Sequence, residues 1–319
     1  MYDLSLPFAA DLFPIPDWLA LWPWAEAAVV LFGFAWGSLL GSFINVVVHR
    51  LPLGESVAGE RSRCPHCRSP IRARDNLPVV GWLLLRGRCR SCGAAIAATY
   101  PLVEALCGGL VALLAAAELA GGGRWLAAPP TGYPQGVDRL LRGDWQLLAT
   151  CCLHAGVVLM VVTWALLDRV GWKCPRSWLP PAVGLVLTVV AIAPPAAPPG
   201  LLADATGWPP GSATWQRLAA SGLGATVGAL VGLAGPGNAF RLGLPLLGGV
   251  LGWQLLAVVT IVTGLAAEIV RQVAPTRADP GGFGLGLAVT ATAALAGHGA
   301  LVAFWREAAA ALRAALTIG

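Results

Sequence analysis

This chain contains few charged side chains: only 12% of its residues are Asp, Glu, Lys or Arg. An average soluble protein carries about 25% of such residues, so the composition excludes an ordinary soluble domain. Hydrophobic residues make up 57% of the chain, and its mean hydropathy is +0.71. These values predict an integral membrane protein.

The chain also has no Lys or Arg in residues 1–24. A cleavable signal peptide carries a basic segment before its apolar run and small residues at a cleavage site after it. We therefore expect the first apolar run to remain as a membrane anchor. The glycine spacing of a phosphate-binding loop is missing as well, so the sequence indicates no nucleotide site.

Apolar runs of about 20 residues, the length that crosses a hydrocarbon core, recur along the chain. A longer run, 242–272, is too long for one crossing, and its glycines near Trp253 favour a short helical hairpin. The sequence predicts an all-α polytopic membrane protein with about eight transmembrane helices, or six if two runs lie at the interface. The single crossings are expected at 25–47, 101–120, 146–167, 178–195, 216–234 and 282–304.

Basic residues gather in one segment between the first two apolar runs. Residues 48–100 contain nine arginines and only three acidic residues. Because basic loops stay on the cytoplasmic side of a membrane, we expect this segment inside and the N-terminus outside. The same loop, next to anionic membrane lipid, accounts for the net charge of +5, so no nucleic acid partner is predicted.

Four cysteines of this basic segment form two Cys-x2-Cys pairs. The pairs are Cys64/Cys67 and Cys89/Cys92, with 21 residues between them. Structural zinc sites are closed by two such pairs of thiolates, so we predict a zinc-ribbon-like domain whose metal holds the loop in shape. Two disulfides or four free thiols remain as alternatives, although a reducing cytoplasm disfavours stable disulfides. His66 is expected to face solvent.

Several segments together resemble the N-terminal half of the type IV prepilin peptidase family. They are GSFINVVVHRLP at 41–52, the two cysteine pairs, DNLPVVGWLLLRGRCRSC at 75–92 and TYPLVEAL at 99–106. The resemblance implies an enzyme of the bacterial inner membrane that cleaves the leader from type IV prepilins or type II secretion pseudopilins at the cytoplasmic face. It also implies N-methylation of the product with S-adenosylmethionine.

The resemblance further implies an intramembrane aspartic protease, which needs two carboxylates. One ionised carboxylate activates water while a protonated one donates to the scissile carbonyl. The first family position is Asp168, in TWALLDRVGWKCP at 163–175. The second lies in GPGNAF at 235–240, where the family aspartate is replaced by Asn238 and the family lysine by Phe240.

An asparagine can neither hold a negative charge nor transfer a proton. The sequence therefore leaves two hypotheses: a working prepilin peptidase that tolerates Asn238, or a peptidase-dead homologue that keeps prepilin binding, methyl transfer or a scaffold role. The amide leads us to expect that proteolysis is lost. Two other acids, Glu104 and Glu268, are not expected to restore the pair of carboxylates.

The predicted organisation has three parts. Residues 1–47 form an N-terminal segment and first transmembrane helix, residues 48–100 a cytoplasmic four-cysteine domain, and residues 101–319 a transmembrane peptidase-like domain. The lone histidines His154 and His298 lie in apolar runs, and we expect each to be satisfied by a backbone carbonyl rather than to act in catalysis.

Overall fold

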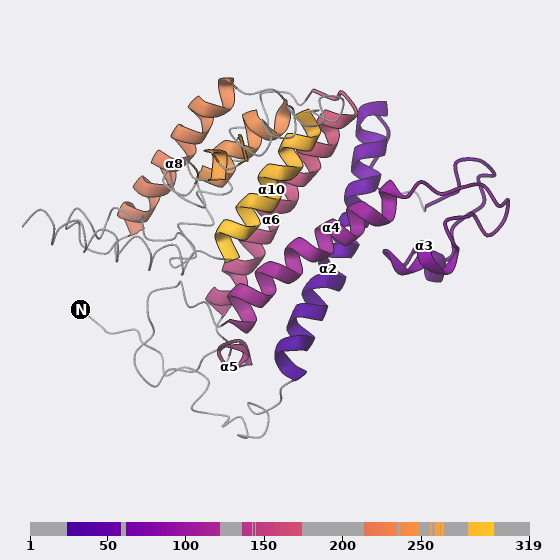
Figure 1. Ribbon diagram of the computed structural model, residues 1–319, viewed down its shortest axis with the longest axis horizontal. Helices are drawn as coiled ribbons and strands as arrows, with labels where there is room; N and C mark the ends of the chain where they lie inside the picture. The colour runs from indigo at the N-terminus through magenta and orange to yellow at the C-terminus, as the bar shows by residue number, and fades with distance from the viewer. Residues whose placement is uncertain are drawn as a thin grey trace, which may run out of the picture.

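The chain folds into helices in a computed structural model (Figure 1). Within the described residues the elements are helices and turns, and no strand is formed. The described residues are 24–58, 62–121, 136–141, 143, 145–173, 214–234, 237–248, 256, 259–261, 263–264 and 280–296.

Three helices are long and apolar enough to cross a membrane. Helix α2 spans Trp24–Arg50, α4 spans Thr99–Leu114 and continues through a π-helical turn at Ala115–Ala120, and α6 spans Trp145–Arg169. They correspond to the runs expected at 25–47, 101–120 and 146–167, so these three predictions of apolar helices are confirmed.

Two more helices carry shorter apolar segments. Helix α8 spans Thr214–Ala234 and α10 spans Pro280–Ala296. The run expected at 178–195 lies outside the described residues, as do the end of the last run and most of 242–272. The total of eight transmembrane helices therefore stays a prediction.

Helix α2 ends for local reasons that the sequence carries. Its last turn holds His49 and Arg50, and positive charge is favourable at the negative end of the helix dipole. The chain then makes a 3₁₀ turn at Leu51–Leu53 that contains Pro52. Gly54 follows in the left-handed conformation (φ 69°) and donates its N–H to the Leu51 carbonyl, as is common after a helix. The basic loop begins there.

Helices α2 and α4 pack closely because glycines line the face of α2 that contacts α4. A Cβ added at Gly37 would lie 2.6 Å from the Cys107 carbonyl oxygen, and one at Gly33 would lie 2.9 Å from the Ala115 Cβ. Gly41 meets Cys107 in the same way. Small residues at every fourth position let two membrane helices approach through their backbones, and this spacing does so here.

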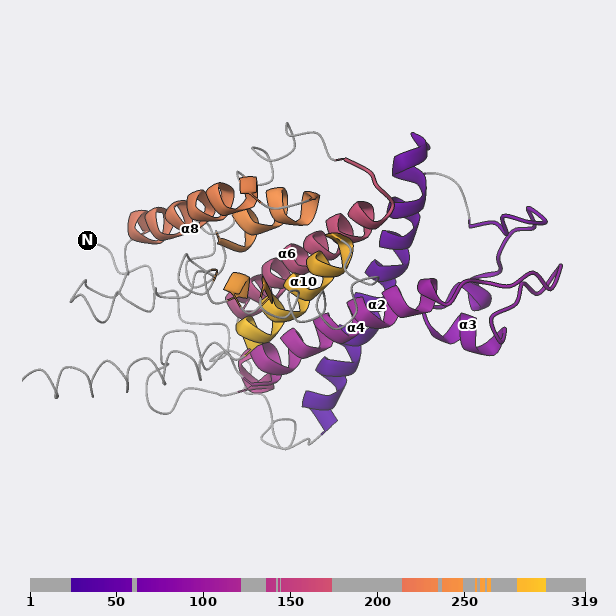
Figure 2. The ribbon, with the colours of Figure 1, turned by 45° about the horizontal axis from the view of Figure 1, so that its top comes forward.

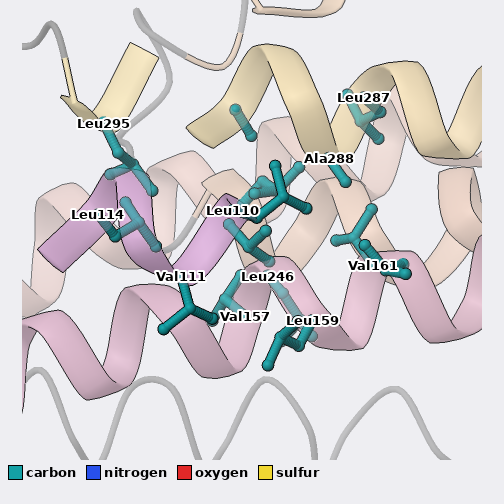
Figure 3. Close-up of a cluster of buried hydrophobic side chains, with 14 of the residues drawn as sticks. Leu110, Val111, Leu114, Val157, Leu159, Val161, Leu246, Leu287, Ala288 and Leu295 are labelled. Atoms are coloured by element: carbon teal, nitrogen blue, oxygen red, sulfur yellow. The ribbon is translucent and has the colours of Figure 1, made fainter. Parts of the chain in front are cut away.

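The core lies between α4, α6 and α10 (Figure 3). Leu110 and Leu114 of α4 share one interdigitated cluster of apolar side chains with Val161 of α6 and with Leu287 of α10. All of these side chains are buried. Membrane helices gain little from expelling water, so this interdigitation acts mainly through dispersion contacts.

Helices α4 and α6 run antiparallel. Glu118, near the C-terminal end of the α4 segment, contacts His154 in the first half of α6. Figures 1 and 2 show the C-terminal end of α6 extending toward the start of α4. Figure 2 shows α10 lying along α6, and the basic loop leaving the helices at the N-terminal end of α4. The loop and the end of α6 therefore lie on the same side of the helical body.

We predict that Gly37→Ala destabilises the protein. The new methyl group would meet the Cys107 carbonyl and the Val111 side chain at less than 3 Å, and overpacking of this kind costs about 1–3 kcal/mol. Thermal unfolding of the purified protein in detergent measures the effect. Gly109→Ala is the matched control, because a Cβ at that α4 position has no neighbour within 4 Å; equal losses in both variants would contradict the close α2–α4 contact.

Candidate functional site

The four cysteines of the basic loop come together in space. Their sulfur atoms all lie within 4.8 Å of one another, and Cys64 Sγ is 3.9 Å from Cys92 Sγ. Each pair sits in a tight turn of the same design. Cys64 N–H donates to the Ser69 carbonyl and Cys89 N–H donates to the Ala94 carbonyl, 3.0 and 2.8 Å away. This is the tetrathiolate donor set that a metal ion such as zinc uses.

The electrostatics of the loop favour ionised sulfur at some of these positions. Hydrogen bonds from the side chain and backbone of Ser69 lower the pKa of Cys67 to about 6. Backbone N–H groups of Cys92 and Ser91 lower the pKa of Cys89. Since a thiolate rather than a thiol is the metal ligand, these donors prepare the site to bind a cation.

Polar contacts hold the rest of the loop in place. Arg90 donates two hydrogen bonds to the Asp75 carboxylate, at 2.7 and 2.8 Å, and these bonds lower the pKa of Asp75. Trp82 donates its indole N–H to the Ile96 carbonyl at 3.0 Å. The loop therefore owes its shape to hydrogen bonds and to the cysteine cluster more than to an apolar core.

Glu104 ties this loop to α4. Its Oε2 accepts a hydrogen bond from the Val79 backbone N–H at 2.7 Å. Val79 has a φ of 60°, a conformation that costs a β-branched residue about 1–3 kcal/mol. The carboxylate of Glu104 thus anchors a strained backbone position, and this contact is its role in the structure.

A cavity of about 790 Å³ lies between the end of α2, the cysteine loop and the start of α4. Its lining includes Asn45, Arg63, Cys64, Trp82 and Glu104. The volume falls in the range of small-molecule and cofactor sites, which is about 300–1,000 Å³.

The second group of predicted site residues also comes together. Asp168, in the last turn of α6, lies against the segment that begins at Gly237. Its Oδ1 accepts the Asn238 backbone N–H at 2.6 Å and its Oδ2 accepts the Ala239 backbone N–H at 2.9 Å. The Asn238 side-chain amide donates to the Trp172 carbonyl at 2.6 Å. Arg241 adds a favourable charge near Asp168.

Gly237 makes this approach possible. It has a φ of 83°, and a Cβ built on it would lie 2.6 Å from Asp168 Oδ2. A side chain at this position would therefore be strained in its backbone and would also displace the carboxylate. The structure thus brings together the two residues that the sequence singled out, although they are 70 positions apart.

The structure also reveals a buried pair that sequence reasoning missed. His154 Nδ1 lies 2.7 Å from Glu118 Oε1, and both side chains are 0% exposed. Glu118 belongs to the π-helical turn after α4, and its Oε2 has no hydrogen-bond partner among the described residues. The expectation of a backbone carbonyl partner for His154 is incomplete, because a carboxylate of the neighbouring helix contacts its ring. The available signal was a glutamate inside one apolar run and a histidine inside the next.

Comparison with known proteins assigns the N-terminal part. Residues 35–118 match the family described as the Bacterial Peptidase A24 N-terminal domain. Over this part the chain is similar to the N-terminal domain of bacterial A24 peptidases. The prepilin leader peptidase/N-methyltransferase of Myxococcus xanthus (strain DK1622) is 49% identical over 78 residues, which cover 24% of this chain and 23% of that protein.

Other relatives are similar to the same N-terminal part of the chain. The type 4 prepilin-like proteins leader peptide-processing enzyme of Escherichia coli O78:H11 is 44% identical over 98 residues, 25% of this chain and 36% of its own length. The prepilin leader peptidase/N-methyltransferase of Aeromonas hydrophila is 39% identical over 130 residues, which cover 33% of this chain and 43% of that protein. The chain thus spans less than half the length of these relatives. No solved structure matches it.

Some features predicted from the sequence lie outside the described residues. Glu268, His298 and the proline of the Asp168 motif are among them, and the side chain of Phe240 is not described either. His66 is exposed, as expected.

We predict that breaking the Glu118–His154 pair is more harmful than removing it. Glu118→Leu leaves a buried imidazole without its carboxylate, and loss of one member of a buried pair costs about 3–5 kcal/mol. The double variant Glu118→Leu/His154→Leu removes both polar groups and should unfold at a higher temperature than either single variant. Thermal unfolding in detergent tests this, and strictly additive losses would contradict a direct interaction.

Proposed function

We propose that this protein is an inner-membrane member of the prepilin peptidase family that binds type IV prepilins or pseudopilins, removes their leader at the cytoplasmic face and N-methylates the product. The observation that carries the proposal is the matched segment 35–118, whose relatives are named prepilin leader peptidase/N-methyltransferase. The three apolar helices support a membrane location.

The proposed side of the membrane follows from charge and packing. The arginine-rich loop would lie in the cytoplasm, with the N-terminus outside. The antiparallel packing of α4 and α6 puts Asp168 at the loop end of the helices. A carboxylate at that depth would meet a leader peptide where an apolar pilin helix emerges from the membrane into the cytoplasm.

The proposed hydrolysis depends on Asp168. Two backbone N–H donors hold both of its oxygens in a fixed orientation, which suits a carboxylate that positions and activates a water molecule. Asn238, in the place of the second family aspartate, can donate a hydrogen bond to a scissile carbonyl but has no proton to transfer. Loss of a general acid lowers a rate by about 10²–10⁴-fold.

An alternative function follows from the same asparagine. In it the protein keeps prepilin binding, methyl transfer or a scaffold role but does not cleave. The comparisons do not favour this alternative, since their names describe leader-processing enzymes. It rests on the chemistry of the amide, which cannot ionise and which donates one of its two side-chain N–H groups to the Trp172 carbonyl.

The decisive measurement is cleavage of a prepilin encoded in the same genome by purified protein. We expect slow cleavage by the natural sequence, lost in Asp168→Ala and raised about 10²–10⁴-fold in Asn238→Asp, because the new carboxyl group can supply the missing proton. Cleavage that survives Asp168→Ala would contradict the proposed role of Asp168.

A binding assay separates the two functions. Crosslinking of the prepilin to the natural sequence without any cleavage, followed by cleavage only in Asn238→Asp, would establish the alternative. Gly37→Ala serves as a control for general loss of stability, because it lies outside the Asp168 site. Absence of both crosslinking and cleavage would overturn the proposal as a whole.

We also propose that Cys64, Cys67, Cys89 and Cys92 hold one structural zinc ion. The donor set fits zinc, because four sulfur atoms lie within 4.8 Å of one another and two of the thiols have lowered pKa values. A site closed by four thiolates leaves no position for substrate. Zinc would therefore shape the loop and take no part in hydrolysis.

Metal analysis tests the zinc site directly. Protein purified under reducing conditions should contain about one zinc per chain, and Cys92→Ser should lower both this content and the protease resistance of the loop, because structural zinc contributes to folding. Cys152→Ser is the control, since Cys152 is exposed on α6 away from the loop. Equal zinc content in the two variants would refute the assignment.

The methyl donor S-adenosylmethionine is implied by the names of the relatives. The cavity beside the cysteine loop has a suitable volume, and its arginines would suit the carboxylate of the cofactor. The same arginines would oppose its sulfonium cation, so the fit is incomplete and we derive no methyl-transfer step from this cavity.

A further inference from the structure

The cavity between α2 and the cysteine loop has an excess of positive charge. Five arginines line it, against the three carboxylates of Glu55, Asp75 and Glu104. Contacts within the protein already engage some of these arginines and some of these carboxylates. Arg90 pairs with Asp75, Arg50 donates to the Ser56 carbonyl at 3.1 Å, and Glu104 accepts from Val79.

Three guanidinium groups are left over after these contacts. Arg63, Arg68 and Arg72 make no hydrogen bond or ion pair through their side chains to the part of the chain that the structure describes. All three are exposed at the cavity. A guanidinium fork matches the oxygen atoms of a phosphate group. The unpaired charge therefore selects an anionic ligand and disfavours a cationic one.

An apolar surface lies on the same loop. The short helix α3, Val80–Leu84, and the residues before it expose four large apolar side chains, with Leu83 at 59% and Leu84 at 69% exposure. Val80, Leu83 and Leu84 have the i, i+3, i+4 spacing of one helical face, while Gly81 on the same helix is buried against the Asp75 backbone. The α3 patch consists of Leu77, Val80, Leu83 and Leu84.

The place of this loop completes the argument. It joins the C-terminal end of α2 to the N-terminal end of α4, and both helices are long and apolar enough to cross a membrane. Figures 1 and 2 show α3 standing apart from the helical body at that end. Leu77 of the α3 patch lines the same cavity as the three arginines. One loop therefore carries both exposed apolar side chains and unpaired positive charge, which is the chemistry of a surface that meets acyl chains and anionic headgroups together.

We propose that the cysteine loop docks on the membrane surface by binding an anionic phospholipid, with its phosphate at Arg63, Arg68 and Arg72 and the α3 patch in the acyl region. The lipid would lie in the cavity beside α2 and hold the loop against the bilayer. This proposal is independent of any enzymatic activity.

Lipid binding to the full-length protein in detergent tests the proposal. Fluorescent phosphatidylglycerol should bind and be displaced by unlabelled phosphatidylglycerol, but not by phosphatidylcholine or inorganic phosphate. Equal displacement by phosphatidylcholine would overturn the role of the arginines. Displacement by inorganic phosphate would make the site one for a soluble anion, and this would also overturn the proposal.

Charge removal at the cavity gives the quantitative test. Each basic residue near an anionic lipid surface contributes about 1 kcal/mol, so Arg63→Gln/Arg68→Gln/Arg72→Gln should weaken phosphatidylglycerol binding roughly 100-fold. The matched control replaces three arginines of the same loop that do not line the cavity, and should weaken binding less than about 10-fold. Equal losses would mean diffuse attraction and contradict a defined site. The control variant is Arg74→Gln/Arg86→Gln/Arg88→Gln.

Two further measurements separate lipid binding from unfolding of the loop and from binding of a pilin. Unchanged zinc content in each variant shows that the loop is still folded. Leu83→Gln/Leu84→Gln should also reduce phosphatidylglycerol binding, because both side chains are exposed and would leave the acyl region. An apolar pilin helix that displaces the lipid from this surface would assign the α3 patch to a protein partner and overturn the proposal.

Discussion

The antiparallel contact between α4 and α6 fixes where the functional groups of this protein lie. A membrane helix satisfies its own backbone, so its rotation and depth are set by side-chain contacts with its neighbours. At one end of this interface the buried Glu118 and His154 meet at 2.7 Å. Leu110 and Leu114 of α4 and Val161 of α6 belong to one buried apolar cluster. At the other end Asp168 and the cysteine loop come to the same side.

The three long apolar helices could be predicted from the sequence because the bilayer imposes both the length and the apolarity of a helix that crosses it. The cysteine site was equally accessible, since each Cys-x2-Cys pair is a local turn whose geometry depends on few residues. The Glu118–His154 pair was not predictable in this way. Neither residue has a local signature, and their meeting depends on the relative rotation of two helices and on the π-helical turn at Ala115–Ala120.

The contact between Asp168 and Gly237 could be predicted only in part. The glycine could be recognised as part of a motif, but the reason for a glycine is visible only in three dimensions. The carboxylate approaches so closely that a Cβ at Gly237 would lie 2.6 Å from it, and the backbone there has a φ of 83°. Asp168 and Asn238, the neighbour of this glycine, are 70 positions apart in the sequence, so only the packing of the Gly237 segment against the end of α6 brings them together.

The cysteine loop follows a different physical rule from the helices. Most of its apolar side chains are exposed, so burial contributes little to its shape, and small units of this kind depend on a metal or other crosslink. Its arginines and leucines are therefore free to serve contacts outside the chain. Glu104 connects the loop to α4, and the bidentate Arg90–Asp75 pair connects two parts of the loop. Neither contact uses the exposed leucines.

Asn238 is well suited to the geometry that surrounds it. Its amide donates to the Trp172 carbonyl while its backbone N–H binds Asp168. An aspartate in the same position would direct a carboxylate at that carbonyl and stand beside a second carboxylate, so one of the two would have to hold a proton. That shared proton is the source of acid–base chemistry in an aspartic dyad. The asparagine removes the electrostatic conflict and, with it, the proton that two aspartates in these positions would share.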